Sequence, residues 1–176
     1  MEKKIGKATG WIGYTLSWTN RQFDSLNFGN PFPYRYDRRH DIGVAFTYEF
    51  NDNVNMGIVW VYGTGNAVTL GQERYLSMSD VQNAFNYGHT NAFQGIEHIS
   101  SRNNYRMPSY HRLDFSFNFT KQKKWGQRTI SLGVYNAYSR QNPFYLEFTS
   151  DENGNTQLSQ YSLFPIIPSF NYSFKF

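Results

Sequence analysis

The 176-residue chain contains no cysteine, so neither a disulfide-stapled domain nor a thiolate metal site can form. It also contains no apolar run near the roughly 20 residues that a membrane-spanning helix needs, which excludes a helical membrane protein. Long basic stripes are absent as well, because the net charge of +4 is spread over short groups of lysine and arginine. Nucleic-acid binding therefore finds little support.

Aromatic residues are abundant: 16 Phe, 14 Tyr and 4 Trp make up 19% of a chain whose mean hydropathy is only −0.65. This content argues against intrinsic disorder, since disordered chains are poor in aromatic and β-branched residues. The length suits one domain. The composition thus poses the question of how a polar average coexists with so many rings.

Apolar and polar side chains alternate along six segments, a pattern typical of β-strands with one apolar face. From Asp41 to Phe50, every even position is apolar and every odd position is small or polar. In the fifth segment, Asn136 is the one polar residue on the apolar side. No helix-period stripe of comparable length occurs, so the predicted fold class is all-β. The predicted strands are residues 12–18, 41–50, 54–62, 112–120, 129–138 and 169–176.

The connections between these strands alternate in length. Residues 51–53 and 121–128 form short turns, whereas residues 20–37, 63–110 and 139–168 form long connections that all leave the same end of the predicted sheet. Structureless loops above about 15 residues are uncommon in compact domains and are usually functional. Short periplasmic turns and long extracellular loops are typical of an outer-membrane β-barrel, whose strands also keep one polar face.

Aromatic residues fall toward both ends of the predicted apolar faces, as two interfacial girdles would require. Those at the loop end are Trp18, Trp60, Tyr62 and Tyr138, and those at the turn end are Tyr48, Phe50, Trp125, Phe174 and Phe176. The last strand carries a ring at every second position: Phe170, Tyr172, Phe174 and Phe176. This ending resembles the carboxyl-terminal β-signal that outer-membrane proteins present to the barrel assembly machinery.

Six strands are too few for a closed barrel, since known bacterial barrels have about 8 strands or more. Only closed barrels can span a membrane as sheets. No export signal is visible at the amino terminus. We therefore expect residues 1–176 to be the carboxyl-terminal part of a longer, antiparallel up-and-down transmembrane barrel, not closed on its own.

Six segments together resemble the barrel of TonB-dependent outer-membrane receptors, most closely the branch with a carboxypeptidase-regulatory-like amino-terminal domain. They are residues 10–17, 35–41, 60–67, 102–114, 135–144 and 163–169. The resemblance implies a barrel of about 22 strands with a plugged lumen. It also implies active import of a nutrient, such as a siderophore, peptide or glycan, across the outer membrane of a Gram-negative bacterium.

The resemblance also sets the expected partners. These are outer-membrane lipid, the barrel assembly machinery, the substrate, and TonB through a plug region that the 176 residues do not contain. No cofactor, metal or nucleic acid is expected. Neither a Ser-His-Asp order nor a paired-carboxylate pattern stands out, so an enzyme is not predicted. The four histidines, His40, His89, His98 and His111, lack tight ligand spacing and are interpreted as solvated loop residues.

Charged residues open two of the predicted strands with the same spacing, Arg39 with Asp41 and Arg112 with Asp114. Residues two apart share a strand face, so these four charges are expected to line the lumen. They could contact plug or substrate, or they could form salt bridges that neutralise charge and hold register. Glu49, near the turn end, could likewise contact a plug.

The long loops are the expected sites of recognition. Ring-bearing candidates in the middle loop are Tyr75, Phe85, Tyr87, Phe93 and Tyr105, which could stack on a ligand or pack as a lid. In the last loop, Asn153-Gly154 predicts a hairpin tip between residues 144–149 and 158–163. Pro165 and Pro168 predict a bend or bulge in the final strand.

Two alternatives remain open. Counting residues 144–149 and 158–163 as separate membrane strands gives a small eight-stranded barrel, which would serve as an adhesin or a structural protein. The other alternative is a soluble β-sandwich binding protein, in which the apolar faces pack on each other.

Overall fold

The computed structural model describes residues 2–71, 73–75, 96–153 and 155–176. The chain divides into two compact units: a sheet unit of residues 1–17, 38–65 and 108–176, and a loop unit of residues 18–37 and 66–107. Strands dominate the described residues, and the one helical segment is the 3-10 turn η1 (Asn27–Gly29). No helix in this part of the chain is long and apolar enough to cross a membrane.

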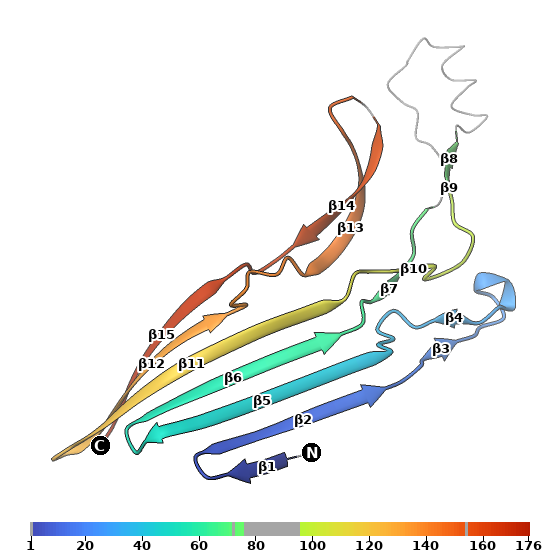
Figure 1. The fold of residues 1–176 in the computed structure, drawn as a ribbon. Coiled ribbons are helices and arrows are strands. Elements are labelled where there is room, and N and C mark those ends of the chain that lie inside the picture. Colours follow the sequence, from blue (N-terminus) through green and yellow to red (C-terminus); the bar gives the residue numbers. More distant parts are fainter. Residues whose placement is uncertain (1, 72, 76–95, 154) are drawn as a thin grey trace. The chain divides into compact units, whose positions relative to one another are not determined.

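The sheet unit is built on one seven-stranded antiparallel sheet, the main sheet (Figure 1). In spatial order its strands are β1 (Glu2–Ile5), β2 (Ala8–Leu16), β5 (His40–Asn51), β6 (Val54–Gly63), β11 (Tyr110–Lys123), β12 (Gly126–Tyr135) and β15 (Ile167–Lys175). Because spatial order follows chain order, the sheet is an up-and-down meander. The outer strands β1 and β15 do not pair with each other, so the sheet is open. The predicted all-β, antiparallel and unclosed fold is confirmed.

Six of these strands match the six predicted ones, and β1 is the strand that the prediction of about six missed. Glu2–Ile5 is too short and too charged to show a period-2 pattern. The first predicted strand was also shifted, since β2 runs from Ala8 to Leu16 and leaves Trp18 in the loop unit. The fifth was too long, because β12 ends at Tyr135.

The register gathers the alternating residues of all strands onto two faces. Directly opposed residues lie on the same face of a sheet, and Phe46, Ile58 and Phe115 are opposed across β5, β6 and β11. This row continues through Val134 to Pro168 and belongs to what we call the apolar face. The next row, on the polar face, consists of Thr47, Gly57, Ser116, Gly133 and Ser169.

The apolar face of the main sheet has no core of its own. Among the described residues, the buried hydrophobic side chains are Phe32, Ala67 and Met107, and all three belong to the loop unit. Apolar-face residues stay exposed, with Leu132 47% and Phe170 68% accessible. Since an apolar sheet face must be buried against something, the sheet unit alone does not supply its cover.

The two ends of the main sheet differ. At the turn end, residues 6–7, 52–53 and 124–125 join adjacent strands directly. At the loop end, the three long connections leave. Two of them contribute the loop unit, whose short pairs are β3 (Asn20–Arg21) with β4 (Phe32–Pro33), β7 (Ala67–Val68) with β10 (Tyr105–Arg106), and β8 (Glu73–Tyr75) with β9 (Ile96–His98).

The third long connection folds as the predicted hairpin. Strands β13 (Pro143–Ser150) and β14 (Thr156–Ser162) pair with each other in a separate two-stranded sheet. Asn153 lies in its turn, while Gly154 falls outside the described residues. The predicted break also occurs, because β14 ends at Ser162 and β15 begins at Ile167. Pro168 itself pairs with Val134 without a register shift, and an edge strand tolerates its missing N–H.

Candidate functional site

Arg112 and Asp114 form the centre of a polar network on the polar face. The Nε and Nη2 atoms of Arg112 both lie 2.9 Å from Oδ2 of Asp114. Its Nη1 donates to the hydroxyls of Tyr110 and Tyr135, at 3.0 and 2.7 Å, and the guanidinium lies 4.1 Å from the centre of the Tyr135 ring. Oδ1 of Asp114 accepts from the backbone N–H of Asn136 at 2.9 Å. These bonds favour the salt-bridge interpretation over a free substrate-binding charge.

The other predicted charges do not join this network. Asp41 pairs with Arg38 at 3.2 Å rather than with Arg39, and both partners are about half exposed. Because β6 lies between β5 and β11, Asp41 is two strands away from Arg112 on the same face. Glu49 lies at the other end of β5, where its backbone N–H donates to the Lys7 carbonyl.

A belt of tyrosine and histidine rings crosses the loop end of the apolar face. The Tyr14 hydroxyl lies 2.9 Å from Nδ1 of His40, and the Tyr138 hydroxyl lies 2.7 Å from Nδ1 of His111. Tyr62 stacks on His111, with ring centroids 6.5 Å apart. His40 and His111 are therefore strand residues bonded to tyrosine, which corrects the prediction of solvated loop histidines.

Of the remaining histidines, the structure describes one. His98 is exposed in β9, and His89 lies outside the described residues. In the part of the chain that the structure describes, no three His, Asp or Glu side chains come close enough together to hold a metal ion.

A second group of rings gathers at the turn end of the apolar face. The ring centroid of Trp125 lies 5.1 Å from that of Phe174, and the Phe174 and Phe176 ring centroids are 6.1 Å apart. Tyr48 and Phe50 are 4.9 Å apart. The rings of the predicted assembly signal thus lie on β15 or directly after it, with Phe170 and Tyr172 exposed on the apolar face.

Aromatic and arginine side chains surround a hollow of about 540 Å³ in the loop unit. Arg21 lies over the Tyr34 ring at 3.9 Å, and Arg102 lies over the Phe32 ring at 5.7 Å. A volume of this size suits a small ligand. Among the described residues that line the hollow none is a carboxylate, so it can accept a carboxylate or phosphate beside an apolar group. Its lining is Arg21, Phe23, Leu26, Phe32, Tyr34, Arg35, Val68, Thr69, Arg102 and Asn103.

The walls of this hollow are held together by a buried ion pair. Asp37 is 2% exposed, and its Oδ2 accepts from Nη2 of Arg106 at 2.6 Å. Nη1 of Arg106 donates to the Asp37 carbonyl, and Oδ1 of Asp37 accepts from the backbone N–H of Thr19. Asn103 donates to the carbonyl of Pro33 at 2.7 Å. These bonds join residues 18–37 to residues 66–107.

The predicted recognition residues do not line the hollow. Tyr105 lies in β10 opposite Val68 and is partly exposed, and the backbone of Tyr75 belongs to β8. Phe85, Tyr87 and Phe93 lie outside the described residues. The rings that do line it, Phe23, Phe32 and Tyr34, come from residues 23–34, and Arg21 and Arg35 flank this stretch. The prediction did not single out these residues.

No known protein family, curated protein or solved structure matches the chain. The geometry therefore carries the functional argument. It offers an uncovered apolar face with ringed ends, a satisfied polar network on the opposite face, and an arginine-lined hollow in the loop unit.

Proposed function

We propose that this chain is a segment of an outer-membrane β-barrel, from the carboxyl-terminal part of a TonB-dependent transporter that imports a nutrient. The observation that carries the proposal is the apolar face, which is continuous across the main sheet and uncovered within the sheet unit. Lipid can cover the apolar face without a second layer of protein. Strands of a membrane barrel also alternate between apolar, lipid-facing residues and polar ones, as the strands of the main sheet do.

The ends of the apolar face support the same placement. Tyrosine, tryptophan and histidine rings lie at the loop end, and tryptophan and phenylalanine rings lie at the turn end. Amphipathic rings favour the two membrane–water interfaces. The turn end would then face the periplasm, and the loop unit with its hollow would be extracellular, where a nutrient is first met.

A barrel segment explains the open edges better than a small closed barrel does. The small-barrel alternative needs residues 144–149 and 158–163 as membrane strands, but β13 and β14 pair only with each other, while β12 pairs directly with β15. The sandwich alternative needs buried apolar side chains between two sheets, and none of the buried hydrophobic residues described belongs to the main sheet. Both alternatives are therefore disfavoured.

A matched pair of substitutions on β12 tests the membrane placement. Leu132 lies on the apolar face and Ser131 on the polar face near the middle of the strand. We expect Leu132→Arg to lower membrane-inserted stability by about 2–4 kcal/mol, the cost of arginine near the bilayer midplane, and Ser131→Arg to be tolerated. Urea unfolding of the parent barrel in lipid vesicles measures both, since the open sheet of this chain cannot span a bilayer by itself. Equal tolerance of the two variants would argue for a water-facing sheet.

The transport part of the proposal needs the parent gene. An in-frame coding region for a plug domain upstream of this chain would support it. In the parent protein, deletion of the TonB box is expected to abolish nutrient uptake while leaving the protein in the outer membrane. Uptake that persists without the TonB box would refute active transport.

A further inference from the structure

All the lysines of the chain lie at one end of the main sheet. They are Lys3, Lys4, Lys7, Lys121, Lys123, Lys124 and Lys175. Each lies in a short turn or in a strand residue next to the turn end, and the three long connections contain none. Arg128, near the start of β12, adds a further cation at this end. The positive charge of the lysines is thus segregated by topology.

Part of this charge lies on the apolar face. Lys121 and Arg128 are directly opposed across β11 and β12, in the same alternation as Phe119 and Ile130. By contrast, the carboxylates of the long strands, Asp41, Glu49 and Asp114, all occupy polar-face positions. No acidic partner in these strands therefore shares the face with the two cations.

The opposed pair is short of an anion. Like charges directly across a strand pair are destabilising, and the Nε atom of Arg128 is buried with no hydrogen-bond partner. On its other side Arg128 is opposed to Phe174, whose ring packs 5.1 Å from Trp125. A phosphate held between Lys121 and Arg128 would remove the repulsion between these two side chains. In a phospholipid, the glycerol and upper acyl region would then lie beside the rings of Phe174 and Trp125.

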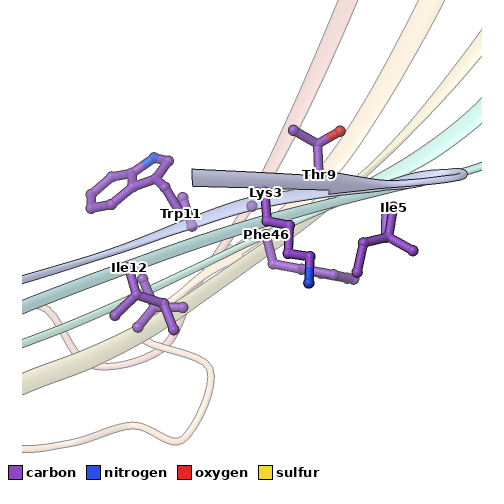
Figure 2. A pocket seen from close by; sticks show the side chains of 10 residues that line it. Lys3, Ile5, Thr9, Trp11, Ile12 and Phe46 are labelled. Carbon is purple, nitrogen blue, oxygen red and sulfur yellow. The ribbon is translucent and has the colours of Figure 1, made fainter. Parts of the chain in front are cut away.

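A hollow beside Lys3 offers space for an acyl chain. Figure 2 shows Lys3, Ile5 and Phe46 on one side of the β1–β2 hairpin and Thr9 and Trp11 on the other. The hollow measures about 330 Å³ and is almost entirely apolar apart from the Lys3 amine. Gly10, which lines the hollow, lets β2 approach β5 closely, since a Cβ there would lie 2.8 Å from the Ala45 carbonyl oxygen.

We infer that the turn end of the apolar face binds anionic phospholipids, with the headgroup phosphate between Lys121 and Arg128. The inference rests on the proposed function, because the face must lie in a bilayer for a headgroup to reach this level. Cations near an anionic lipid surface each strengthen membrane binding, and salt weakens the effect. The sheet would thereby be anchored with its turn end in the anionic leaflet.

Vesicle binding of the full chain tests this inference. The chain is added to phosphatidylcholine vesicles and to vesicles in which part of this lipid is replaced by phosphatidylglycerol. We expect tighter binding to the second kind, and an about thirty-fold loss of affinity for it in the double variant Lys121→Gln/Arg128→Gln. The control is Lys4→Gln/Lys175→Gln, which removes two cations from the polar face at the same end and is expected to cost less than the first double variant, because neither cation lies on the face that contacts lipid.

Protection from trypsin in neutral vesicles reports insertion separately. A chain that inserts in both vesicle kinds with equal affinity overturns the lipid inference and leaves the membrane placement standing. A chain that binds neither kind of vesicle overturns the lipid inference. Because an open sheet cannot span a bilayer by itself, the membrane placement is then tested by the Leu132→Arg and Ser131→Arg variants in the parent barrel. Equal losses in the two double variants would also overturn the inference, because charge alone would then matter and the face would not. Circular dichroism in detergent confirms that the variants fold.

Discussion

Asn136 shows how one residue ends a strand. Its alternation places it on the apolar side, yet its φ of +52° is left-handed and its side chain is 1% exposed. Asparagine tolerates this conformation better than most residues. The side-chain Nδ2 donates to the carbonyls of Arg140 and Phe164, while Oδ1 accepts from the Arg140 N–H. Asn136 is therefore a turn-forming residue that ties the start of the last loop to its end.

Replacing Asn136 should be costly. Asn136→Ala leaves part-buried backbone groups of Arg140 and Phe164 without this partner, and we expect it to lower the free energy of unfolding by about 1–3 kcal/mol. The control is Asn171→Ala on β15, where the side chain is exposed and the expected cost is below about 0.5 kcal/mol. Urea titration followed by tryptophan fluorescence measures both variants. A loss at Asn136 no larger than at Asn171 would refute the role of its hydrogen bonds.

The β13–β14 hairpin is an element that stabilises itself. At its turn, Oδ1 of Asp151 accepts from the backbone N–H groups of Asn153 and Asn155. Across the strands, the Tyr145 and Tyr161 rings stack with centroids 4.5 Å apart and planes 9° from parallel. Local bonds and a cross-strand ring pair let this hairpin form without joining the main sheet.

The ring pair gives the hairpin a pH dependence. Loss of solvent around the Tyr145 phenol raises its pKa, and Tyr161 and Glu147 add to the rise. The folded hairpin favours the neutral phenol of Tyr145. The contribution of this phenol to the stability of the hairpin is therefore fully present below its ordinary pKa of about 10, and it is lost as pH rises through the raised pKa. A pH titration of phenolate absorbance measures this pKa, with the Tyr145→Phe variant subtracted to isolate Tyr145. The midpoint of the difference should lie above the ordinary tyrosine pKa of about 10. A midpoint at or below it would contradict the packing.

At the scale of the molecule, the open main sheet is the dominant feature. Unpaired edges such as those of β1 and β15 are templates for association with further strands. Pro168 leaves one position of the β15 edge without a donor, but most of that strand keeps its backbone groups. The fold is thus suited to pairing with further strands at its edges.

Gel mobility tests whether the chain closes by itself. A closed barrel resists dodecyl sulfate until boiled and changes its mobility afterwards. Since the main sheet is open, we expect the purified chain in detergent to migrate at one position with and without boiling. A compact, heat-modifiable band would contradict the open sheet and revive the small closed barrel.

Much of the fold could be predicted because period-2 alternation is a local property. Residues 41–50 and 54–62 were placed within one residue of β5 and β6. The predicted strand boundaries were wrong where a hydrogen bond to a distant residue decides where the strand ends. The end of β12 is an example, since Asn136 donates to the carbonyl of Phe164, 28 residues along the chain. The site was harder still: the pairing of Asp37 with Arg106 spans 69 residues, and no spacing rule indicates it.

The sequence by itself determined the class of fold, the two faces of each strand and the segregation of lysine, because side-chain direction and turn position follow from neighbouring residues. Only the tertiary structure decided that β1 adds a seventh strand, that the hairpin stays apart, and that Lys121 faces Arg128. These depend on inter-strand register, which fixes which residues of distant segments stand side by side.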